Sequence, residues 1–322
     1  MIAMSVNPVV LLGNDDDEPD HDVMFTEIAR QGGEAIRVHP HELVIEIVNS
    51  KPLFLVNGKQ VTPALVIGWV YEDDLLLGMN QLETFRLAGI PVVNTAMTLL
   101  RGQSKYLNSA LMAASDVQHP DVAWGQQVET LHTAADKLGY PLVYKPMMSS
   151  LGRGVVRVDN RDDLSGLVAE RNPEGDGYRV QNEGFYLQKH IDAGARDIRV
   201  MCVNYRAVIS YQRTAPTGQW RSNTPGCERV VVELTDEIRD LAERASEAVG
   251  GLFTGVDLAK DVHGRLYIYE VNTCPTFFEP SQALGVPPVA LTEAGSFLYA
   301  ASQDFERARQ EWRPTVHAHA GR

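Results

Sequence analysis

The sequence predicts a small α/β domain over the first hundred residues, followed by a larger α+β region with antiparallel strands. Apolar strands alternate with helical segments up to about residue 100, whereas short and often alternating strands dominate after about residue 185. The chain has 322 residues, of which 44% are hydrophobic. This length and composition allow a large buried core and about two domains.

The N-terminal part opens with a strand-helix unit. The segment PVVLLG (8–13) predicts a buried strand, which leads through the acidic loop NDDDEPDHD into the helical pattern VMFTEIARQGG. Further strands are predicted over 34–39 and 64–70, and the Asn57-Gly58 pair between apolar runs predicts a hairpin. A helix over 75–89 and the segment IPVVN follow. This alternation favours a mostly parallel sheet.

The remaining two thirds of the chain show a different pattern of helices and strands. Helices are predicted over 103–113 and over 130–139, the second ending at Gly139. Strands are then predicted over 186–191, 197–203, 206–213, 229–234, 255–260 and 265–272, with one helix over 235–250 between them. The tail from residue 306 is charged and irregular, so we expect it to fray.

Composition and charge exclude several function classes. The net charge of -13 argues against a nucleic-acid partner, because phosphate backbones are bound by an excess of Lys and Arg. The three cysteines, Cys202, Cys227 and Cys274, are far apart and support neither a disulfide framework nor a CxxC zinc site. The chain has no basic segment before its first apolar run and no apolar stretch long enough to span a membrane. We therefore expect a cytoplasmic protein with no membrane partner.

The segment PLVYKPMMSSLGRGVVRV, residues 141–158, predicts a strand, a glycine-containing loop and a second strand. It is not a P-loop, because Lys145 precedes the loop and a strand follows it, and it lacks the glycine spacing of a dinucleotide-binding turn. Backbone N–H groups of such a hairpin tip can close over phosphate oxygens, with Lys145 reaching them from the strand. The alternative is a surface hairpin with a solvated lysine.

A second polar pattern occurs in GVDLAKDVHGRLYIYEVN. A tight turn at DVHG would place Asp257 opposite Ile268 and diagonal to Glu270, so that Asp257, Glu270 and Asn272 share one face of a hairpin. Two carboxylates and an amide oxygen suit a hard divalent cation such as Mg²⁺. Acidic residues that alternate with apolar ones are also typical of a solvated sheet face, and that alternative stays open here.

Arginines recur between these two motifs. Arg199, Arg213 and Arg221 lie on predicted strands or at their ends, and Asn223 follows closely. Guanidinium groups bind phosphate or carboxylate oxygens in a forked geometry, although arginines at strand edges can also serve only solubility. Together, a lysine with a glycine hairpin, a set of arginines and a three-ligand acidic face fit one anionic nucleotide held through metal ions.

The order Lys145, SSLGRG, YLQKHI, DIR, WRSN, GVDL and EVNTCP resembles the ATP-grasp superfamily, and within it the RimK-like group of carboxylate-amine ligases. The resemblance is dense from about residue 94 to 276 and weaker before it. It implies an ATP-grasp fold in which two α+β subdomains sandwich ATP behind a small N-terminal α/β domain. The implied boundaries are an N-terminal domain over 1–100, a central lid subdomain over 101–190, a C-terminal subdomain with the metal site over 191–305 and the tail over 306–322.

The resemblance also implies residue roles. The loop from Ser149 to Gly154 would form a mobile lid, the segment 188–191 would line the adenine pocket through backbone groups, and Asp197 would lie near the ribose. The implied nucleotide-binding residues are Lys105, Lys145, Ser149, Ser150, Gly152, Gly154, Gln188, Lys189, His190, Ile191, Asp197, Arg221, Ser222 and Asn223. The implied metal ligands, for two Mg²⁺ ions that Mn²⁺ can replace, are Asp257, Glu270 and Asn272. The implied catalytic residues are Lys145, Arg213 and Arg221, with Arg213 placed where an acyl phosphate forms.

The implied reaction is ATP-dependent, ADP-forming amide synthesis through an acyl phosphate. Its partners would be a small-molecule or peptide carboxylate and an amine such as an amino acid, with glutamate as one candidate, and a homo-oligomer would be usual for the family. Two alternatives stay open: a cyclising or dipeptide-type ligase of natural-product biosynthesis, and a nucleotide-binding protein without ligase activity.

The chain departs from the glutamate-ligating members of the group at several positions. Trp69 stands where those members have Arg, TPGCERV replaces a His-Arg-Gly-Gly run, TCPTF replaces Ser-Pro-Gly, and Lys189 stands where an acidic residue is common. These changes concern substrate specificity rather than the ATP chemistry. Trp69, Tyr71, Glu72 and Asp73, with the acidic loop 15–17, could face the acceptor and attract an amine, or could simply be solvated.

Overall fold

The first ninety residues fold around a four-stranded parallel sheet. The computed structural model describes residues 7–71, 73–147, 152–171 and 184–315. The strand order is β2-β1-β6-β7, with β1 Val9–Gly13, β2 Ala35–Val38, β6 Leu65–Trp69 and β7 Val92–Val93. Every residue of β1 is buried, as a parallel strand covered on both faces requires. The predicted α/β unit is therefore confirmed.

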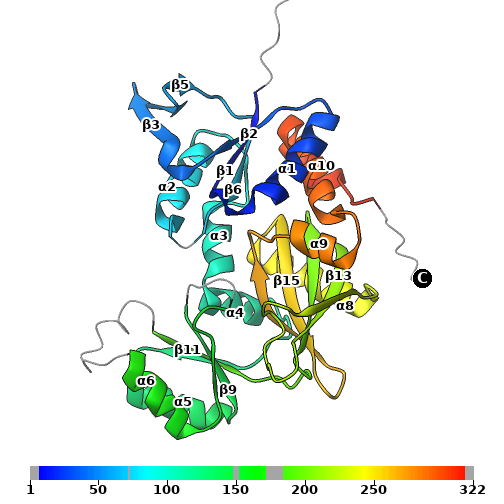
Figure 1. Cartoon of the computed structure of the whole chain (residues 1–322). Coiled ribbons are helices and arrows are strands. Elements are labelled where there is room, and N and C mark those ends of the chain that lie inside the picture. Colours follow the sequence, from blue (N-terminus) through cyan, green and yellow to red (C-terminus); the bar gives the residue numbers. More distant parts are fainter. Residues whose placement is uncertain (1–6, 72, 148–151, 172–183, 316–322) are drawn as a thin grey trace, which may run out of the picture.

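Helices cover both faces of this sheet. Residues Val9 and Leu11 share a hydrophobic cluster with α1 (Glu18–Arg30) and α10 (Val289–Gln303). Residues Val10 and Leu12 point to the opposite face, toward α2 (Leu75–Leu87) and α3 (Ala96–Gln103). Figure 1 shows the sheet between these helix layers at one end of the molecule. Two short 3-10 helices, Asp15–Asp17 and Pro40–Glu42, lie in its loops.

A small antiparallel sheet stands beside the parallel one. It has the order β3-β4-β5, with β3 Leu43–Val48, β4 Lys51–Val56 and β5 Lys59–Gln60. The predicted Asn57-Gly58 hairpin is confirmed, and both turn residues have the positive φ that a two-residue hairpin turn demands. The sequence interpretation missed β3. This strand exposes Val44, Ile47 and Val48, so its apolar residues do not alternate as those of a half-buried strand do.

The segment 122–189 forms a four-stranded antiparallel sheet of order β10-β9-β11-β8. Its strands are β8 Val122–Gly125, β9 Leu142–Lys145, β10 Val156–Val158 and β11 Phe185–Lys189. Helices α5 (Val128–Leu138) and α6 (Arg161–Arg171) contribute Leu131 and Leu164 to a cluster with the sheet residues Leu142 and Leu187. The predicted strand-loop-strand element is confirmed, because β9 pairs with β10. Residues 148–151 of its loop lie outside the described residues.

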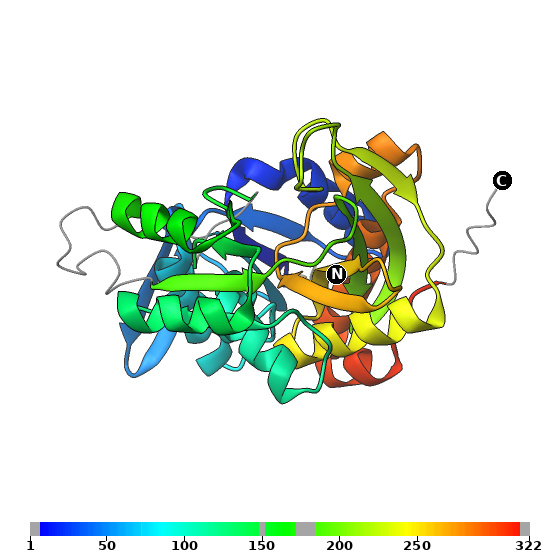
Figure 2. The same ribbon diagram turned by 90° about the horizontal axis from the view of Figure 1, so that it is seen from below.

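The largest sheet has one apolar face, and its other face is apolar at one end and polar at the other. Its order is β14-β13-β12-β15-β16, with all pairs antiparallel, and its strands are β12 Arg196–Val203, β13 Arg206–Thr214, β14 Glu228–Val231, β15 Phe253–Lys260 and β16 Leu266–Asn272. Ile198 and Val200 of β12 pack in the cluster with α8 (Asp236–Val249). Asp197 and Arg199 therefore point away from α8, because successive strand residues alternate between faces. Figure 2 shows α8 along the outer side of this sheet.

The register of the β15-β16 hairpin differs from the prediction. Asp257 pairs with Glu270 itself rather than with Ile268, which pairs with Leu258. The unpaired residue between them, Tyr269, forms a bulge, and the turn contains one residue more than predicted, since Asp261 N donates to the carbonyl of Arg265. The bulge brings the two carboxylates directly opposite each other.

The helix predicted over 103–113 corresponds to α4 (Lys105–Ala114), and the sequence interpretation missed α3, which ends directly before it. Ser104 ends α3 and begins α4, and its hydroxyl accepts a hydrogen bond from Leu107 N at 3.3 Å. Lys105 therefore occupies the first position of α4. Its backbone N–H donates to the carbonyl of Met147 at 3.1 Å, which ties α4 to the end of β9.

The prediction of a frayed tail from residue 306 is wrong for its first part. Helix α11 (Phe305–Glu311) is capped by Asp304, whose carboxylate accepts from Arg307 N at 3.0 Å. Trp312 then packs against Phe297 with ring centroids 5.5 Å apart. The segment is held by a tertiary contact, which its charged local sequence does not predict. Residues 316–322 lie outside the described residues.

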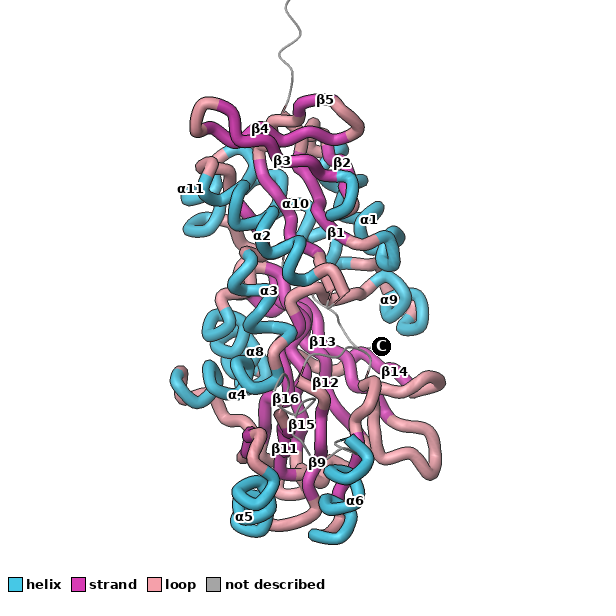
Figure 3. Tube along the Cα trace, turned by 90° about the vertical axis from the view of Figure 1, so that its left-hand side faces the viewer, coloured by secondary structure: helices cyan, strands magenta, loops and turns pink. Residues whose placement is uncertain are grey.

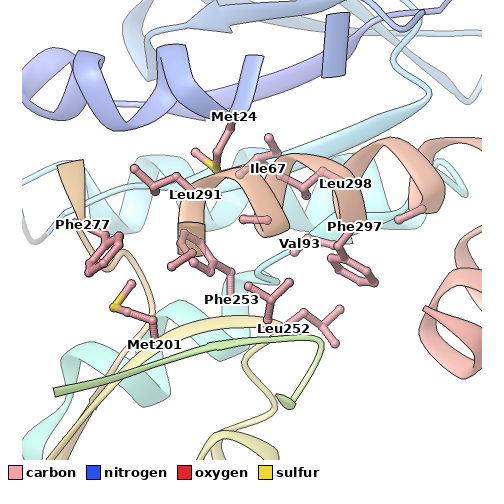
Figure 4. Close-up of a cluster of buried hydrophobic side chains, with 14 of the residues drawn as sticks. Met24, Ile67, Val93, Met201, Leu252, Phe253, Phe277, Leu291, Phe297 and Leu298 are labelled. Atoms are coloured by element: carbon pink, nitrogen blue, oxygen red, sulfur yellow. The ribbon is translucent and has the colours of Figure 1, made fainter. Parts of the chain in front are cut away.

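A hydrophobic cluster joins the N-terminal sheet to the large sheet. Helices α10 and α1 lie together, and α9 (Phe278–Leu284) precedes α10 in the chain. Figure 4 shows Met24, Leu291 and Phe297 above Phe253 and Met201 of the large sheet. The tube view in Figure 3 shows the N-terminal sheet, the large sheet and the 122–189 sheet following one another along the molecule. The boundaries 1–100, 101–190, 191–305 and 306–322 stay a proposal.

Asn94 is the polar connection at this junction. Its buried side chain donates to the carbonyls of Phe253 and Thr273, each at 2.8 Å, and accepts from Leu252 N at 2.8 Å. We expect Asn94→Ala to lower the free energy of unfolding by about 2–4 kcal/mol, because three buried backbone groups lose their partner. Urea unfolding measures this. The control Asn80→Ala, at an exposed position of α2, should change stability little, and equal stabilities of the two variants would contradict the prediction.

No helix among residues 7–71, 73–147, 152–171 and 184–315 has the length and apolar character needed to cross a membrane.

Candidate active site

One cavity of about 700 Å³ opens between the large sheet, the 122–189 sheet and the loops at the edge of the N-terminal sheet. It collects nearly all the predicted site residues that the structure describes. Those lining it are Lys105, Lys145, Gly152, Gln188, Lys189, His190, Ile191, Asp197, Arg213, Arg221, Ser222, Asn223, Asp257, Glu270 and Asn272. Gly154 is outside this lining set, and Ser149 and Ser150 lie outside the described residues. The expected convergence of Lys145 with the acidic face is confirmed.

Two lysines enter the cavity beside the acidic hairpin. Lys105 Nζ lies 3.3 Å from Glu270 Oε1, and only 7% of the Lys105 side chain is exposed. Lys145, at the end of β9, places Nζ 5.5 Å from the ring centre of Tyr269. Burial lowers the pKa of Lys145 to about 8, with Glu270 opposing that shift. Both amines are positioned to meet an anion that enters the cavity.

The glycine loop contacts the large sheet through Arg221. Arg221 Nη1 donates to the carbonyl of Gly152 at 2.7 Å. Gly152 has φ +67° and Gly154 has φ +69°, so both adopt the left-handed conformation that glycine tolerates best. A Cβ at Gly154 would also lie 2.8 Å from Pro146. Residues 152–154 therefore follow a tight backbone turn that lies close to Pro146, just after β9.

Strand β11 continues into the wall of the predicted adenine pocket. Gln188 is buried, and Tyr269 donates its hydroxyl to the carbonyl of Ile191 at 3.3 Å. Lys189 sends its side chain away from this wall, since its Nζ donates to the carbonyl of Leu138 at the end of α5 at 2.6 Å. The side chain of Lys189 therefore caps the C-terminus of α5 rather than entering the predicted adenine pocket.

Four charged side chains form a buried network on the polar face of the large sheet. Arg213 Nε donates to Asp197 Oδ1 at 2.8 Å, and Arg213 Nη2 lies 2.9 Å from Asp257 Oδ1. Arg199 binds the same Asp257 through two nitrogens, one of them at 2.8 Å. Burial would raise the pKa of Asp257, but Arg199 and Arg213 outweigh it and lower that pKa to about 2. Asp257 is therefore ionised at neutral pH.

Three oxygen-bearing side chains stand together at the end of the hairpin. Asp257 and Glu270 are cross-strand partners, and Asn272 follows on β16. The Asn272 amide bridges neighbouring charges: its nitrogen donates to Glu270 Oε1 at 2.8 Å, and its oxygen accepts from Arg199 Nη2 at 3.3 Å.

The donor set fits Mg²⁺ rather than a transition metal. Within the described part of the chain no group of three His, Cys, Asp or Glu side chains is placed to hold a metal ion. Asp257, Glu270 and Asn272 instead offer two carboxylates and an amide, all oxygen ligands. With so few protein ligands, substrate phosphates and water would complete an octahedral shell.

The N-terminal sheet contributes an acidic wall to the same cavity. Asp16, Asp17, Tyr71 and Asp73 line it. Asp17 accepts hydrogen bonds from the Tyr71 hydroxyl and from Trp69 Nε1, the latter at 2.8 Å. The expectation that Trp69 could face the acceptor is wrong: its side chain is buried between the two sheets, with its ring centre 5.8 Å from that of Phe253. Glu72 lies outside the described residues.

The model of the RimK-like ATP-grasp domain matches residues 102–287, more than half of the chain. The chain belongs to this family. As a RimK-like ATP-grasp protein it is an ADP-forming ligase that joins a carboxylate to an amine. The segment that matches contains every predicted nucleotide and metal residue.

Curated relatives of this RimK-like protein carry ligase names. It is 28% identical over 232 residues to the alpha-aminoadipate–LysW ligase LysX of Saccharolobus solfataricus, an alignment that covers 72% of this chain and 78% of the relative. It is 29% identical over 256 residues to a probable alpha-L-glutamate ligase of Alkalilimnicola ehrlichii, which covers 78% of this chain and 82% of that relative.

Solved structures share the fold of the RimK-like protein. The ATP-grasp ligase PsnB, in complex with a phosphomimetic variant of its minimal precursor, Mg and ADP, superposes with a TM-score of 0.70 at 17% identity and covers 92% of this chain and 99% of that chain. The macrocyclase MdnC from Microcystis aeruginosa, bound with the precursor peptide MdnA, gives a TM-score of 0.64 at 14% identity and covers 91% and 99%. The predicted ATP-grasp fold is confirmed.

Sequence reasoning missed several cavity residues of this RimK-like protein. Tyr211 lies two positions before Arg213, so strand alternation could have placed it on the polar face. Tyr269 was missed because strand alternation does not predict the bulge at this residue. Arg229 and Glu279 carry no signal in sequence, because only the pairing of β14 with β13 and the packing of α9 bring them to the cavity.

Proposed function

We propose that this ligase joins the amine of an amino acid to the carboxylate of a small molecule or peptide, through an acyl phosphate formed from ATP. The observation that carries the proposal is the convergence of two lysines and the arginine network with three oxygen ligands in one cavity. No nucleophilic side chain is required, because positioning and charge stabilisation account for most of phosphoryl-transfer catalysis.

In this proposal, ATP lies between the 122–189 sheet and the large sheet. Adenine would lie along the segment 188–191, with the ribose near Asp197 and the phosphates between Lys105 and Lys145. Arg221, Ser222 and Asn223 would contact phosphates from the opposite side. The burial of Lys145 supports this placement, since a buried amine gains most from an anionic partner.

Asp257, Glu270 and Asn272 would hold Mg²⁺, one ion or two. When bound there, Mg²⁺ would neutralise charge on the phosphoryl group that is transferred. Asp257 is kept ionised by Arg199 and Arg213, so its ligand oxygens need no deprotonation before the metal binds. Lys105 balances Glu270 in the absence of metal, at an Nζ to Oε1 distance of 3.3 Å.

The chemistry requires two displacements. A carboxylate oxygen attacks the γ-phosphorus, the bond to the bridging oxygen breaks, and ADP leaves with that electron pair. The amine then attacks the acyl carbon, the bond from that carbon to the phosphate oxygen breaks, and phosphate and one proton are released. Arg213, held rigidly by Asp197 and Asp257, would stabilise the acyl phosphate. The Arg221 to Gly152 contact would hold the lid over this hydrolysable intermediate.

An ADP-release assay tests the proposal. The purified protein is incubated with ATP, Mg²⁺ and pairs drawn from a panel of amino acids and small carboxylates. We expect ADP release that depends on both members of one pair, and a product heavier than the carboxylate by one amino-acid residue. With oxygen-18 in the carboxylate, one labelled oxygen should appear in the released phosphate. Phosphate without the label would exclude the acyl phosphate, and loss of one water from a single substrate would indicate a cyclase.

A further inference from the structure

Arg229 occupies the edge strand of the large sheet next to the proposed acyl-phosphate site. On β14 it is the direct cross-strand partner of Arg213. Directly paired residues have Cα atoms about 4.5–5.5 Å apart and side chains on the same face of the sheet. The Arg229 side chain accordingly lines the cavity. It stands one strand further out than Arg213.

The guanidinium of Arg229 is incompletely satisfied. Its Nη1 lies 3.0 Å from Glu279 Oε1, on α9. Its Nε is buried and has no hydrogen-bond partner in the part of the chain that the structure describes. A buried N–H of this kind costs free energy unless an acceptor reaches it, so the position favours a bound ligand.

Three other arginines that line the cavity are committed to the protein. Arg199 and Arg213 are engaged with buried carboxylates, and Arg221 donates to the carbonyl of Gly152. Among the described residues, the ion-pair partner of Arg229 is Glu279, whose side chain is 67% exposed. An ion pair with so exposed a partner contributes little stability. Arg229 can therefore exchange Glu279 for a substrate anion at small cost.

We propose that Arg229 is a specificity-determining residue that binds the unreacting carboxylate of the amine substrate, an α-amino acid. This inference rests on the proposed function, because it assigns one substrate to the outer part of the same cavity. The carboxylate that is phosphorylated belongs deeper, beside Arg213. A forked guanidinium suits a carboxylate, which it can bind through two nitrogens.

The acidic loop of the N-terminal domain favours an amino acid over a second simple acid. Asp20 of α1 accepts hydrogen bonds from Phe277 N at 2.6 Å and Phe278 N at 3.0 Å, which holds this loop beside the start of α9, the helix that carries Glu279. Asp16 and Asp17 line the same cavity as Arg229. A substrate that carries both an amine and a carboxylate matches these acidic and basic groups electrostatically.

The Arg229 and Glu279 pair provides variants with opposite expected effects. Arg229→Gln removes the carboxylate's partner, whereas Glu279→Gln removes the anion that competes with the substrate for Arg229. We expect the first variant to weaken amino-acid binding about 10-fold or more and the second to tighten it. Arg229→Lys should lie between wild type and Arg229→Gln, since it keeps the charge and loses the fork. If the pair were merely structural, both Gln variants would change amino-acid affinity in the same direction.

The measurement is the shift in melting temperature on adding L-alanine, L-aspartate, L-glutamate or L-lysine to protein saturated with Mg²⁺ and a non-hydrolysable ATP analogue. At least one amino acid should stabilise wild type, and its α-carboxamide should not. The analogue itself should bind all variants equally. Arg206→Gln is the matched control, because it breaks the 2.8 Å pair between Arg206 of β13 and Glu243 of α8, and both residues are outside the set that lines the cavity.

Three outcomes would overturn the inference: no stabilisation of wild type by any amino acid, equal binding of an acid and its α-carboxamide, or unchanged amino-acid affinity in Arg229→Gln. None of these needs turnover. Failure of the proposed function is seen separately, as ADP release that no amino acid and carboxylate pair stimulates.

Discussion

Replacing Lys145 with alanine is expected to lower ADP release by about 100-fold or more, with no loss of stability. Burial lowers the pKa of this lysine to about 8, so the folded protein holds the ammonium group at a cost. Removing it leaves the strand pairing of β9 intact, because backbone groups make those bonds. The expected loss is in the rate of phosphoryl transfer, because that step no longer has a desolvated cation beside the phosphates.

Steady-state ADP release with a saturating substrate pair, together with thermal melting, checks this expectation. Lys260→Ala is the matched control, since Lys260 is exposed on β15 and outside the set of residues that line the cavity. It should retain turnover. If Lys145→Ala turned over ATP at the rate of this control, the phosphate role of Lys145 would be refuted.

The second large effect is expected for Glu270→Gln. Glutamine keeps the shape of the side chain and removes the charge that the metal requires, so turnover should fall by about 100-fold and half-saturation should need about 10-fold more Mg²⁺. Folding should be little affected, because 20% of the Glu270 side chain is exposed and its described ion pair is the one with Lys105.

A Mg²⁺ titration of ADP release at fixed ATP measures this change. Glu243→Gln provides the control. Glu243 lies on α8, on the far face of the sheet, and its carboxylate pairs with Arg206 at 2.8 Å. Its Mg²⁺ dependence should match wild type. A Glu270→Gln titration that coincides with wild type would remove Glu270 from the ligand set. Asp257 is a less clean probe, because its replacement would leave Arg199 buried without its carboxylate partner and Arg213 with Asp197 alone.

Local patterns were sufficient to predict the ATP end of the site. Lys145 ends a short apolar strand just before a glycine loop, and Asp257 and Glu270 lie on two strands joined by a tight turn. Such relations span few residues, so strand alternation and turn chemistry determine which side chains share a face. The bulge at Tyr269 changed the register by a residue, yet the three ligands still converge.

The substrate end could not be predicted in this way. Arg229 reaches the cavity only because β14 pairs with β13, and Glu279 only because α9 packs beside that strand. The acidic loop of the first twenty residues meets them through Asp20, which hydrogen-bonds to backbone more than 250 positions later in the chain. No sequence period encodes contacts between such distant segments.

The amino-acid sequence by itself predicted which side chains gather at the proposed nucleotide and metal sites, because those residues occupy adjacent strands and one hairpin whose geometry is local. Only the tertiary structure decided which further charges line the cavity, that Trp69 is buried and that Lys189 caps a helix. These outcomes depend on how separate sheets and helices pack together, and packing is set by apolar surfaces far apart in the chain.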